Sequence, residues 1–367
     1  MIITLDGTNF DLYNDVSVTV SANKDEAMNK RITMQDVSQE AGVSLMTVSR
    51  VINGKDDVSI DTRNRVMQVI EKLNYRPSSI ARGLATQRTG TLGVVVPDIS
   101  NPFFASLVRS SEDEAYAKNY SVFLGNTNEE QEREIAVLQL LEDNQVDGLI
   151  LCSSRLDDEV LSVSLEHFAS VVLVFREKIG ANVGAVTLDD VMGGQLAIEH
   201  LIRSGHRNIG LISGPVRSLS TKGRFEGYQK ALKAADIPVN HNWIRNCHPT
   251  IKVGQETALE LLKNNPEITA LFCHNDLIAV GALQACLQLG LSVPDNVAII
   301  GYDDINLAAL VTPSLTTIHI PIVEIGARAI QMLLEQMSDA SVEPTQTHFQ
   351  PQLIVRESAP KKKSRND

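Results

Sequence analysis

The hydrophobic positions along most of the chain follow two alternating patterns. Short apolar runs rich in β-branched residues, each bounded by turn residues, read LGVVVPD, SVFLGNT, VDGLILC, SVVLVF, NIGLISG, ALFCHND and VAIIGYDD. Between them lie amphipathic segments, namely Pro102 to Asn119, Glu130 to Asn144, Met192 to Ser204, Lys222 to Ala234, Val253 to Asn264, Asp276 to Leu289 and Val323 to Met337. Strands that are apolar on both faces and alternate with helices predict parallel sheets covered on both sides.

The strand–helix pattern restarts near Asp189 and Asp190, so we expect two lobes. In such folds ligands bind at the carboxyl ends of the strands. Polar residues follow the predicted strands at 98–104, 175–176, 189, 213–224, 275–276 and 302–304. Carboxylates, amides and an arginine beside the Phe103–Phe104 pair predict a site for a ring bearing hydroxyls. Taken singly, each of these residues is equally well explained as a helix cap or a turn.

A different pattern occupies residues 33–74. Thr33 with Asp36 resembles a capping box, and Gly42 ends the first helix because glycine adopts positive φ easily. Ser44 caps a second helix, and a third runs from about Ile60 to Asn74. We expect the inward faces to be Met34, Val37 and Ala41; Val48, Val51 and Ile52; and Val66, Val69, Ile70 and Leu73. Two short helices joined at a tight glycine turn have helix-turn-helix spacing.

The second helix of such a unit enters the major groove of DNA with its N-terminal end first. Leu45, Met46 and Arg50 would then face base edges, and Arg50 can donate two hydrogen bonds to guanine. The remaining DNA-binding candidates hold phosphates or flank the helices: Thr33, Met34, Ser44, Thr47, Ser49, Asn53 and Thr62. The alternative is a three-helix bundle whose exposed Leu45 and Met46 bind a protein.

Charge is distributed unevenly along the chain. The formal net charge is -12, yet residues 29–90 contain ten Lys/Arg and six Asp/Glu, so a small basic unit accompanies an acidic body. Pro77 ends the third helix, and a short helix over Ile80 to Ala85 needs DNA or a second copy to form. A plain flexible linker is the alternative for that segment.

The chain carries few signs of other classes of protein. Cys152, Cys247, Cys273 and Cys286 are scattered, which indicates free thiols in a reducing compartment and no metal site. We find no membrane-length apolar run, no signal peptide and no nucleotide-binding glycine motif. We therefore expect a cytoplasmic protein that is not an enzyme and needs no cofactor.

The ordered motifs resemble the LacI/GalR family of bacterial transcriptional regulators across about residues 31–358. They read TMQDVSQEAGVSLMTVSRVIN, LNYRPSSIARGLATQRTGTLGVVVPDISNPFF, DGLIL, HLIRSGHRNIGLISG, GRFEGYQKAL, FCHNDLIAVGAL, VPDNVAIIGYDD and PSLTTIHIP. The resemblance implies a homodimer on a near-palindromic operator and a periplasmic-binding-protein-like body with an effector, expected to be a carbohydrate, between two lobes. It also implies that Ala81 and Leu84 of the hinge helix enter the minor groove, with Leu84 as a wedge. Arg82, on the same short helix, is a further DNA-binding candidate.

By the same resemblance and the strand-end positions, the candidate effector-binding residues are Asn101, Phe103, Phe104, Phe175, Arg176, Asp189, Arg224, Asn275 and Asp303. Phe175 stands where many members of the family have Asp. The resemblance also implies that the chain crosses between lobes near Asp189, Thr317 and Phe349.

The expected organisation is an N-terminal all-α helix-turn-helix domain followed by a two-lobed α/β domain with parallel sheets. We expect a disordered extension at 1–30, the helix-turn-helix at 31–77, the hinge helix and linker at 78–90, the effector-binding and dimerisation domain at 91–358, and a basic tail at 359–367. The expected function is transcriptional repression controlled by a small molecule. A solute-binding protein and a regulator with a purine effector are the alternatives.

Overall fold

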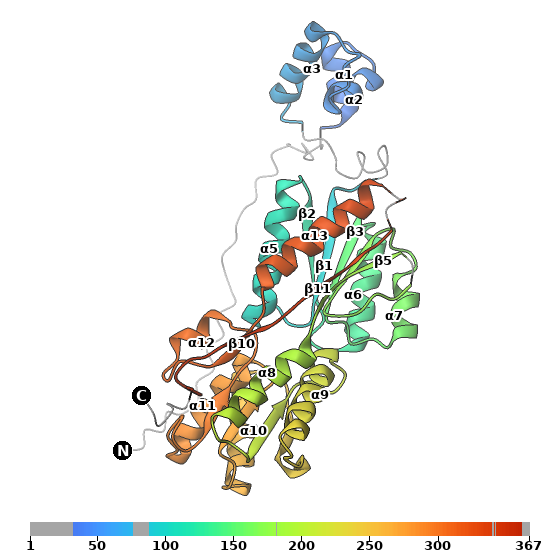
Figure 1. Ribbon diagram of the computed structural model, residues 1–367. Coiled ribbons are helices and arrows are strands. Elements are labelled where there is room, and N and C mark those ends of the chain that lie inside the picture. Colours follow the sequence, from blue (N-terminus) through green and yellow to red (C-terminus); the bar gives the residue numbers. More distant parts are fainter. Residues whose placement is uncertain (1–31, 76–87, 181, 340, 342, 362–367) are drawn as a thin grey trace, which may run out of the picture. The chain divides into compact units, whose positions relative to one another are not determined.

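The computed structural model describes residues 32–75 and 88–361, apart from 181, 340 and 342 (Figure 1). The chain divides into two compact units, residues 1–78 and 79–367. The first unit contains α1 (Met34–Ala41), α2 (Leu45–Ile52) and α3 (Ile60–Lys72). The proposed hinge residues Ala81, Arg82 and Leu84, the extension at 1–30 and most of the basic tail lie outside the described residues.

The three short helices begin where the sequence predicts, and α1 also ends where predicted. Thr33 and Asp36 form a capping box, Ser44 caps α2, and Ser59 caps α3. Gly42 ends α1 at φ 63°. The core contains the predicted inward residues, with Val37, Val48, Val51 and Val66 most deeply buried, and Tyr75, which we did not predict, closes it. The third helix ends two residues earlier than predicted because Asn74 adopts φ 48°, a left-handed conformation.

The first lobe of the second unit is built on a six-stranded parallel sheet in the order β11-β5-β4-β3-β1-β2. Its strands are β1 (Thr91–Val96), β2 (Ser121–Asn126), β3 (Gly148–Cys152), β4 (Val171–Val174), β5 (Val183–Leu188) and β11 (Gln346–Phe349). Alternate residues of the central strands enter two different hydrophobic clusters, as expected of a sheet covered on both faces.

Helices α5 (Pro102–Ala117) and α13 (Ile322–Ser338) lie side by side over one face of this sheet (Figure 1). They pack with Val94 and Ile150, whereas α6 (Gln131–Asp143) and α7 (Asp158–Leu165) cover Val95 and Leu149 on the other face. Gly326 of α13 allows the close approach to α5, because a Cβ there would lie 2.0 Å from Oγ of Ser110.

The second lobe has a four-stranded parallel sheet in the order β7-β6-β8-β9. The strands are β6 (Ile209–Ser213), β7 (Ile244–Asn246), β8 (Ala270–Cys273) and β9 (Ala298–Ile300). Helices α8 (Asp190–Arg203) and α9 (Leu219–Ala234) pack with one face, and α10 (Ile251–Asn264) and α11 (Asp276–Leu289) with the other. A 3-10 turn, η1 (His241–Trp243), α12 (Asn306–Leu310), β10 (Thr317–His319) and β12 (Gln352–Ile354) complete the lobe.

The chain passes between the lobes three times. It leaves the first sheet after β5, returns between β10 and α13, and leaves again between β11 and β12. These positions lie at or within a few residues of Asp189, Thr317 and Phe349, where crossings were expected. The sequence pattern missed β5, β7, β10, β11, β12, α7 and α12, which are short or carry no amphipathic repeat.

Candidate functional site

A cleft lies where the carboxyl ends of the two sheets meet. It is lined by Asn101, Phe103, Phe104, Glu129, Ser153, Arg155 and Phe175 from the first lobe, and by Pro215, Ser218, Ser220, Arg224, Pro249, His274, Asn275 and Asp303 from the second. We call this set the interlobe cleft. Its free volume is about 40 Å³, whereas sites for drug-sized ligands measure about 300–1,000 Å³. The interlobe cleft is therefore narrow in this structure.

Three helices begin at the interlobe cleft, and each is capped by a cleft residue. Asn101 Oδ1 accepts a hydrogen bond from the Phe103 amide at 3.0 Å, and Asn275 Oδ1 accepts one from the Ile278 amide at 3.0 Å. Ser218 caps α9 in the same way. These caps occupy amide groups that would otherwise attract an anion. They leave the Nδ2 groups of the two asparagines as donors for a ligand.

Phenylalanine rings form the apolar wall of the cleft. Phe103 meets Phe104 edge-on at 5.2 Å between ring centres and lies 5.5 Å from the tilted ring of Phe175. Phe175 adopts φ 60°, which is rare for a bulky residue. Glu129, Ser153 and Asp303 also line the cleft with positive φ. Such conformations cost about 1–3 kcal/mol each and concentrate at functional sites.

Arg224 is the central cation of the second lobe's wall. Its Nε donates to Asp190 Oδ1 at 2.9 Å, its Nη2 lies 3.9 Å from Asp303 Oδ1, and its Nη1 donates to the His274 carbonyl. Burial lowers the pKa of the guanidinium, but Asp190, Tyr302 and Asp303 together raise it above its ordinary value. Arg224 is therefore charged. Burial also raises the pKa of Asp303 well above its usual range, although Arg224 opposes that shift.

The first lobe contributes a second buried ion pair. Arg155 Nε lies 2.5 Å from Glu129 Oε2, and both side chains are almost fully buried. Nearby, the Nδ1 atom of His274 is buried with no hydrogen-bond partner among the described residues. Burial first, and then the cations Arg224 and Arg155, lower the pKa of His274 well below its usual value, so its ring is neutral. The cleft thus combines balanced charges with one unsatisfied polar ring.

Seven of the nine effector candidates lie in the interlobe cleft, and two do not. Arg176 points away from it, where Nη1 donates to the Leu156 carbonyl at 2.7 Å and Nη2 pairs with Asp158. Asp189 caps α8 by accepting from the Met192 amide at 2.8 Å, and its neighbour Asp190 is the partner of Arg224. The sequence prediction missed Glu129, Ser153, Arg155, Pro215, Ser218, Ser220, Pro249 and His274. Glu129 and Arg155 follow β2 and β3, so the strand-end rule would have found them.

Most DNA-binding candidates of the first unit lie on α2 or at its two ends. Leu45 and Met46 are 48% and 66% exposed although they are large and apolar. Ser44 Oγ accepts from the Thr47 amide at 3.1 Å, and Asn53 Nδ2 donates to Ser49 Oγ. The remaining candidates Thr33, Met34, Arg50 and Thr62 lie at the start of α1, near the end of α2 and in the first turn of α3. The unit therefore presents an exposed helix of the kind that reads DNA.

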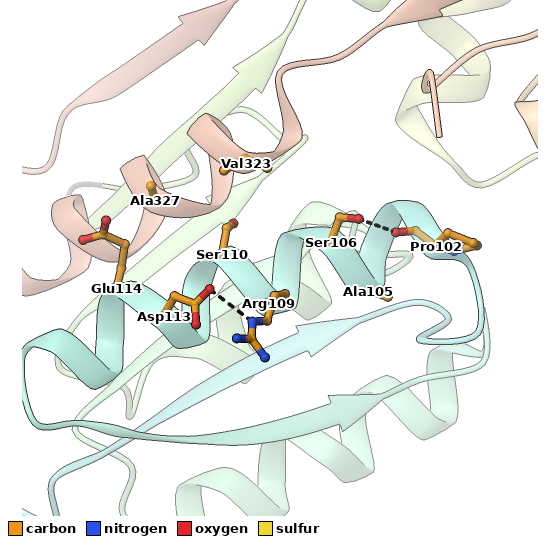
Figure 2. Close-up of a pocket in the computed structure, with 9 residues that line it drawn as sticks. All are labelled: Pro102, Ala105, Ser106, Arg109, Ser110, Asp113, Glu114, Val323 and Ala327. Atoms are coloured by element: carbon orange, nitrogen blue, oxygen red, sulfur yellow. Dashed lines mark hydrogen bonds and ion pairs between the residues drawn. The ribbon is translucent and has the colours of Figure 1, made fainter. Parts of the chain in front are cut away.

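A second hollow, of about 530 Å³, lies on the outer surface between α5 and α13 (Figure 2). It is lined by Pro102, Ala105, Ser106, Arg109, Ser110, Asp113, Glu114, Val323 and Ala327. Figure 2 shows the Arg109–Asp113 ion pair, 3.1 Å between Nε and Oδ2, on the α5 side of the hollow. This hollow and the interlobe cleft share no lining residue. They approach each other in sequence only at the start of α5, where Phe103 and Phe104 line the cleft and Pro102 and Ala105 line the hollow.

Two family models match the chain in turn. Residues 33–78 match the bacterial regulatory proteins of the lacI family, and residues 89–357 match the periplasmic binding proteins and sugar binding domain of the LacI family. The chain belongs to the LacI family. The expected fold is confirmed: an N-terminal helix-turn-helix region and a two-lobed α/β domain with parallel sheets.

Individual LacI-family proteins resemble the chain over most of its length. The transcriptional repressor PurR of Haemophilus influenzae (strain PittEE) is 37% identical over 331 residues, which cover 89% of this chain and 98% of that protein. A lac repressor dimer bound to operator and the anti-inducer ONPF is 27% identical with a TM-score of 0.80, covering 90% of this chain and all of the other. The regulator CelR in complex with cellobiose is 30% identical with a TM-score of 0.68, covering 89% and 100%.

The chain is therefore a LacI-family DNA-binding transcriptional regulator with an effector-binding domain, and its relatives are repressors rather than enzymes. LacI-family repressors bind operator DNA and small-molecule effectors and act as dimers. Among the described residues, no helix is long and apolar enough to cross a membrane.

Proposed function

We propose that this protein is a cytoplasmic repressor whose affinity for operator DNA is set by an uncharged sugar bound in the interlobe cleft. The proposal rests on one observation: the interlobe cleft contains both an aromatic wall, formed by Phe103 and Phe175, and an ion pair between Arg224 and Asp303. A sugar ring has an apolar face that packs on aromatic rings and hydroxyls that both donate and accept hydrogen bonds.

The polar groups of the cleft match hydroxyls better than a charged group. Two cations, Arg155 and Arg224, are each paired with buried carboxylates, so neither is free to neutralise a phosphate. The helix N-termini are already capped by Asn101, Ser218 and Asn275. Burying an additional charge without a partner costs several kcal/mol on an order-of-magnitude scale. A phosphorylated sugar is therefore a poorer ligand than its neutral counterpart.

A purine is the competing effector. The aromatic wall would stack a flat base as well as a sugar face, and the asparagine amides could bond to its edge. The sugar is favoured because the carboxylate of Asp303 and the guanidinium of Arg224 lie together. The carboxylate can accept a hydrogen bond from one hydroxyl of the sugar while the guanidinium donates one to the neighbouring hydroxyl. One solved structure with this fold is the regulator CelR in complex with the sugar cellobiose.

Effector binding requires the lobes to move apart. About 40 Å³ of free volume holds little more than one water molecule, which occupies about 30 Å³ in the liquid. An exposed pair, Arg217 and Asp157, spans the lobes at 3.5 Å and must separate or stretch when they open. The ligand thus shifts the population of lobe arrangements, and that shift changes the affinity for DNA.

We further propose that α5, α13 and the edge strand β2 form the face on which two copies associate. Large apolar side chains are exposed there, including Tyr116 at 80% and Val323 at 58%, together with Leu124 of β2. A monomer rarely exposes several such side chains on one face. Arg109, Asp113 and Glu114 around the hollow in Figure 2 supply both signs of charge, which a two-fold symmetric contact can pair.

The first experiment is a thermal-shift screen of the full chain against neutral sugars, the same sugars as phosphates, and purine bases. A ligand at 100 times its Kd adds about 2.7 kcal/mol of stability, which is readily detected. Each ligand that stabilises the protein is then added to an operator-binding assay. A neutral sugar that stabilises the protein and changes DNA binding supports the proposal. A purine as the sole active compound supports the competing effector, and stabilisation without any change in DNA binding contradicts control of the operator.

A further inference from the structure

We propose that Asp57 determines DNA sequence specificity by holding Arg50 in the orientation that reads a base. Nη1 of Arg50 lies 2.7 Å from Oδ2 of Asp57, and the two side chains are 49% and 54% exposed. This inference rests on the proposed operator binding. Asp57 was not among the DNA-binding candidates, because a carboxylate is repelled by phosphates and contributes nothing to affinity for the DNA backbone.

The turn between α2 and α3 fixes the position of Asp57. The Lys55 amide donates to the Arg50 carbonyl at 3.0 Å, and Gly54 adopts φ 68° to make that turn. From the other side, Arg63 Nη2 of α3 donates to the Lys55 carbonyl at 2.6 Å. The turn is thus tied to both helices, so the carboxylate that follows it occupies a defined place beside Arg50.

The pairing leaves Arg50 able to read guanine. Two-donor recognition of guanine needs only two parallel N–H groups of the guanidinium, which carries five. With Nη1 held by Asp57, the Nε and Nη2 edge has no partner among the described residues. Arg50 lies one helical turn after Met46, so the two side chains share an exposed face of α2. An arginine that is already oriented loses less conformational freedom when it binds the base.

Asp57 also suppresses binding to DNA of any sequence. Over residues 29–78 the chain has eight Lys/Arg and six Asp/Glu, so this unit has only a small excess of positive charge. Pairing with Asp57 cancels the charge of Arg50 near the phosphates while keeping its donors for a base. The carboxylate therefore lowers non-specific affinity and raises the ratio of specific to non-specific binding.

The test selects duplexes from a randomised library with the full-length protein and four sequences: wild type, Asp57→Asn, Arg50→Ala and Asp56→Asn. Asp56 is the matched control, since the same charge is removed one residue away and Asp56 makes no ion pair with a described residue. Arg50→Ala should lose the preference for guanine at one symmetric pair of positions. Asp57→Asn should weaken that preference by at least about fivefold and leave the other positions unchanged.

The salt dependence of non-specific binding gives a second readout. Releasing Arg50 to a phosphate should steepen the slope of log K against log salt by about 0.9 in Asp57→Asn and not in Asp56→Asn, provided the freed cation adds one phosphate contact. If Asp57→Asn selects the wild-type motif and matches Asp56→Asn in slope, the role of Asp57 is disproved. If wild type enriches no motif at all, operator binding fails and this inference fails with it. Melting curves of all four proteins check that each is folded.

Discussion

The guanidinium carbon of Arg224 lies 3.6 Å from the centre of the Tyr302 ring. Stacking on one face and carboxylates at two edges hold this arginine in a single orientation toward the interlobe cleft. An arginine fixed in this way meets a ligand without losing rotamer freedom, so its contribution to affinity exceeds that of a mobile side chain.

Arg224→Lys should reduce the affinity for the effector at least about tenfold, because lysine neither stacks as a plane nor donates along two edges. The protein should remain folded, since the positive charge beside Asp190 and Asp303 is kept. Arg224→Ala should instead destabilise the fold by about 3–5 kcal/mol, because it leaves buried carboxylates without their cation. Calorimetric titration and thermal melts measure the two effects. Equal affinity for the effector in wild type and Arg224→Lys would show that Arg224 does not bind the effector.

Phe175→Leu should lower effector affinity by about 0.5–1.5 kcal/mol, the contribution of an aromatic pair beyond its buried area. Leucine keeps most of the apolar bulk but loses the ring that lies beside Phe103. Phe225→Leu is the matched control, because Phe225 stacks on Tyr228 and does not line the cleft. Titration with the same ligand compares the three proteins. A similar loss in both variants would show that the effect is not specific to the cleft.

Stability should fall as the pH rises from about 4 to about 7 because of Asp276. Burial raises the pKa of this carboxyl to about 7, although hydrogen bonds from Thr317 and the Ile305 amide oppose the shift. The folded protein therefore keeps a proton that the unfolded chain, with a pKa near 3.8, has lost. Each pH unit in that window costs up to about 1.4 kcal/mol.

Asp276→Asn should flatten this dependence, since asparagine cannot ionise and still accepts from Ile305 and donates to Thr317. Chemical denaturation at pH 5, 6 and 7 measures the slope. Asp113→Asn, on the exposed surface of α5, should leave the slope unchanged. A wild-type slope that persists in Asp276→Asn would assign the effect to other carboxyls, such as Asp303.

Replacing Tyr116 and Val323 together by Asp should convert the dimer to a monomer if α5, α13 and β2 form the contact between copies. Two charges introduced into an apolar contact have no partners and cost several kcal/mol on an order-of-magnitude scale. Leu140→Asp is the control, because Leu140 is also exposed but belongs to α6 on the other face of the sheet. Sedimentation velocity distinguishes the species. Dissociation caused by Leu140→Asp alone would place the contact elsewhere.

Leu84→Ala should weaken specific operator binding far more than binding to unrelated DNA. An apolar wedge is useful only where a base step is kinked, and the non-specific complex depends on charge instead. Gel-shift titrations with operator and with a scrambled duplex compare the two losses. Equal losses would leave Leu84 without that role.

The sequence predicted the helix-turn-helix core and the alternation of the two lobes because both depend on apolar periodicity, as in Val37, Val48 and Val66. Through the rule that polar residues follow strands, it selected Asn101, Arg224 and Asn275, which line the interlobe cleft. It could not tell which of two neighbouring residues lines the cleft. Phe175 enters the cleft and Arg176 does not, because the left-handed backbone at Phe175 turns the chain there.

Local sequence patterns likewise could not predict which distant residues form ion pairs. Glu129 and Arg155 are separated by 26 positions, and Asp57 meets Arg50 only through the folded turn. Such pairs depend on which strand ends become neighbours, and the apolar periodicity of one segment does not predict the order of the strands in a sheet.

The three crossings of the chain have an evolutionary consequence. Neither lobe is a continuous stretch of the gene, since the first lobe combines β1 to β5 with α13 and β11, and the second combines α8 to β10 with β12. The three helices of the first unit, in contrast, occupy one uninterrupted segment from Met34 to Lys72. A single recombination event between the two units can therefore join an existing sensor to a new set of target genes. One lobe alone cannot be exchanged by such an event, because its segments alternate along the gene with those of the other lobe.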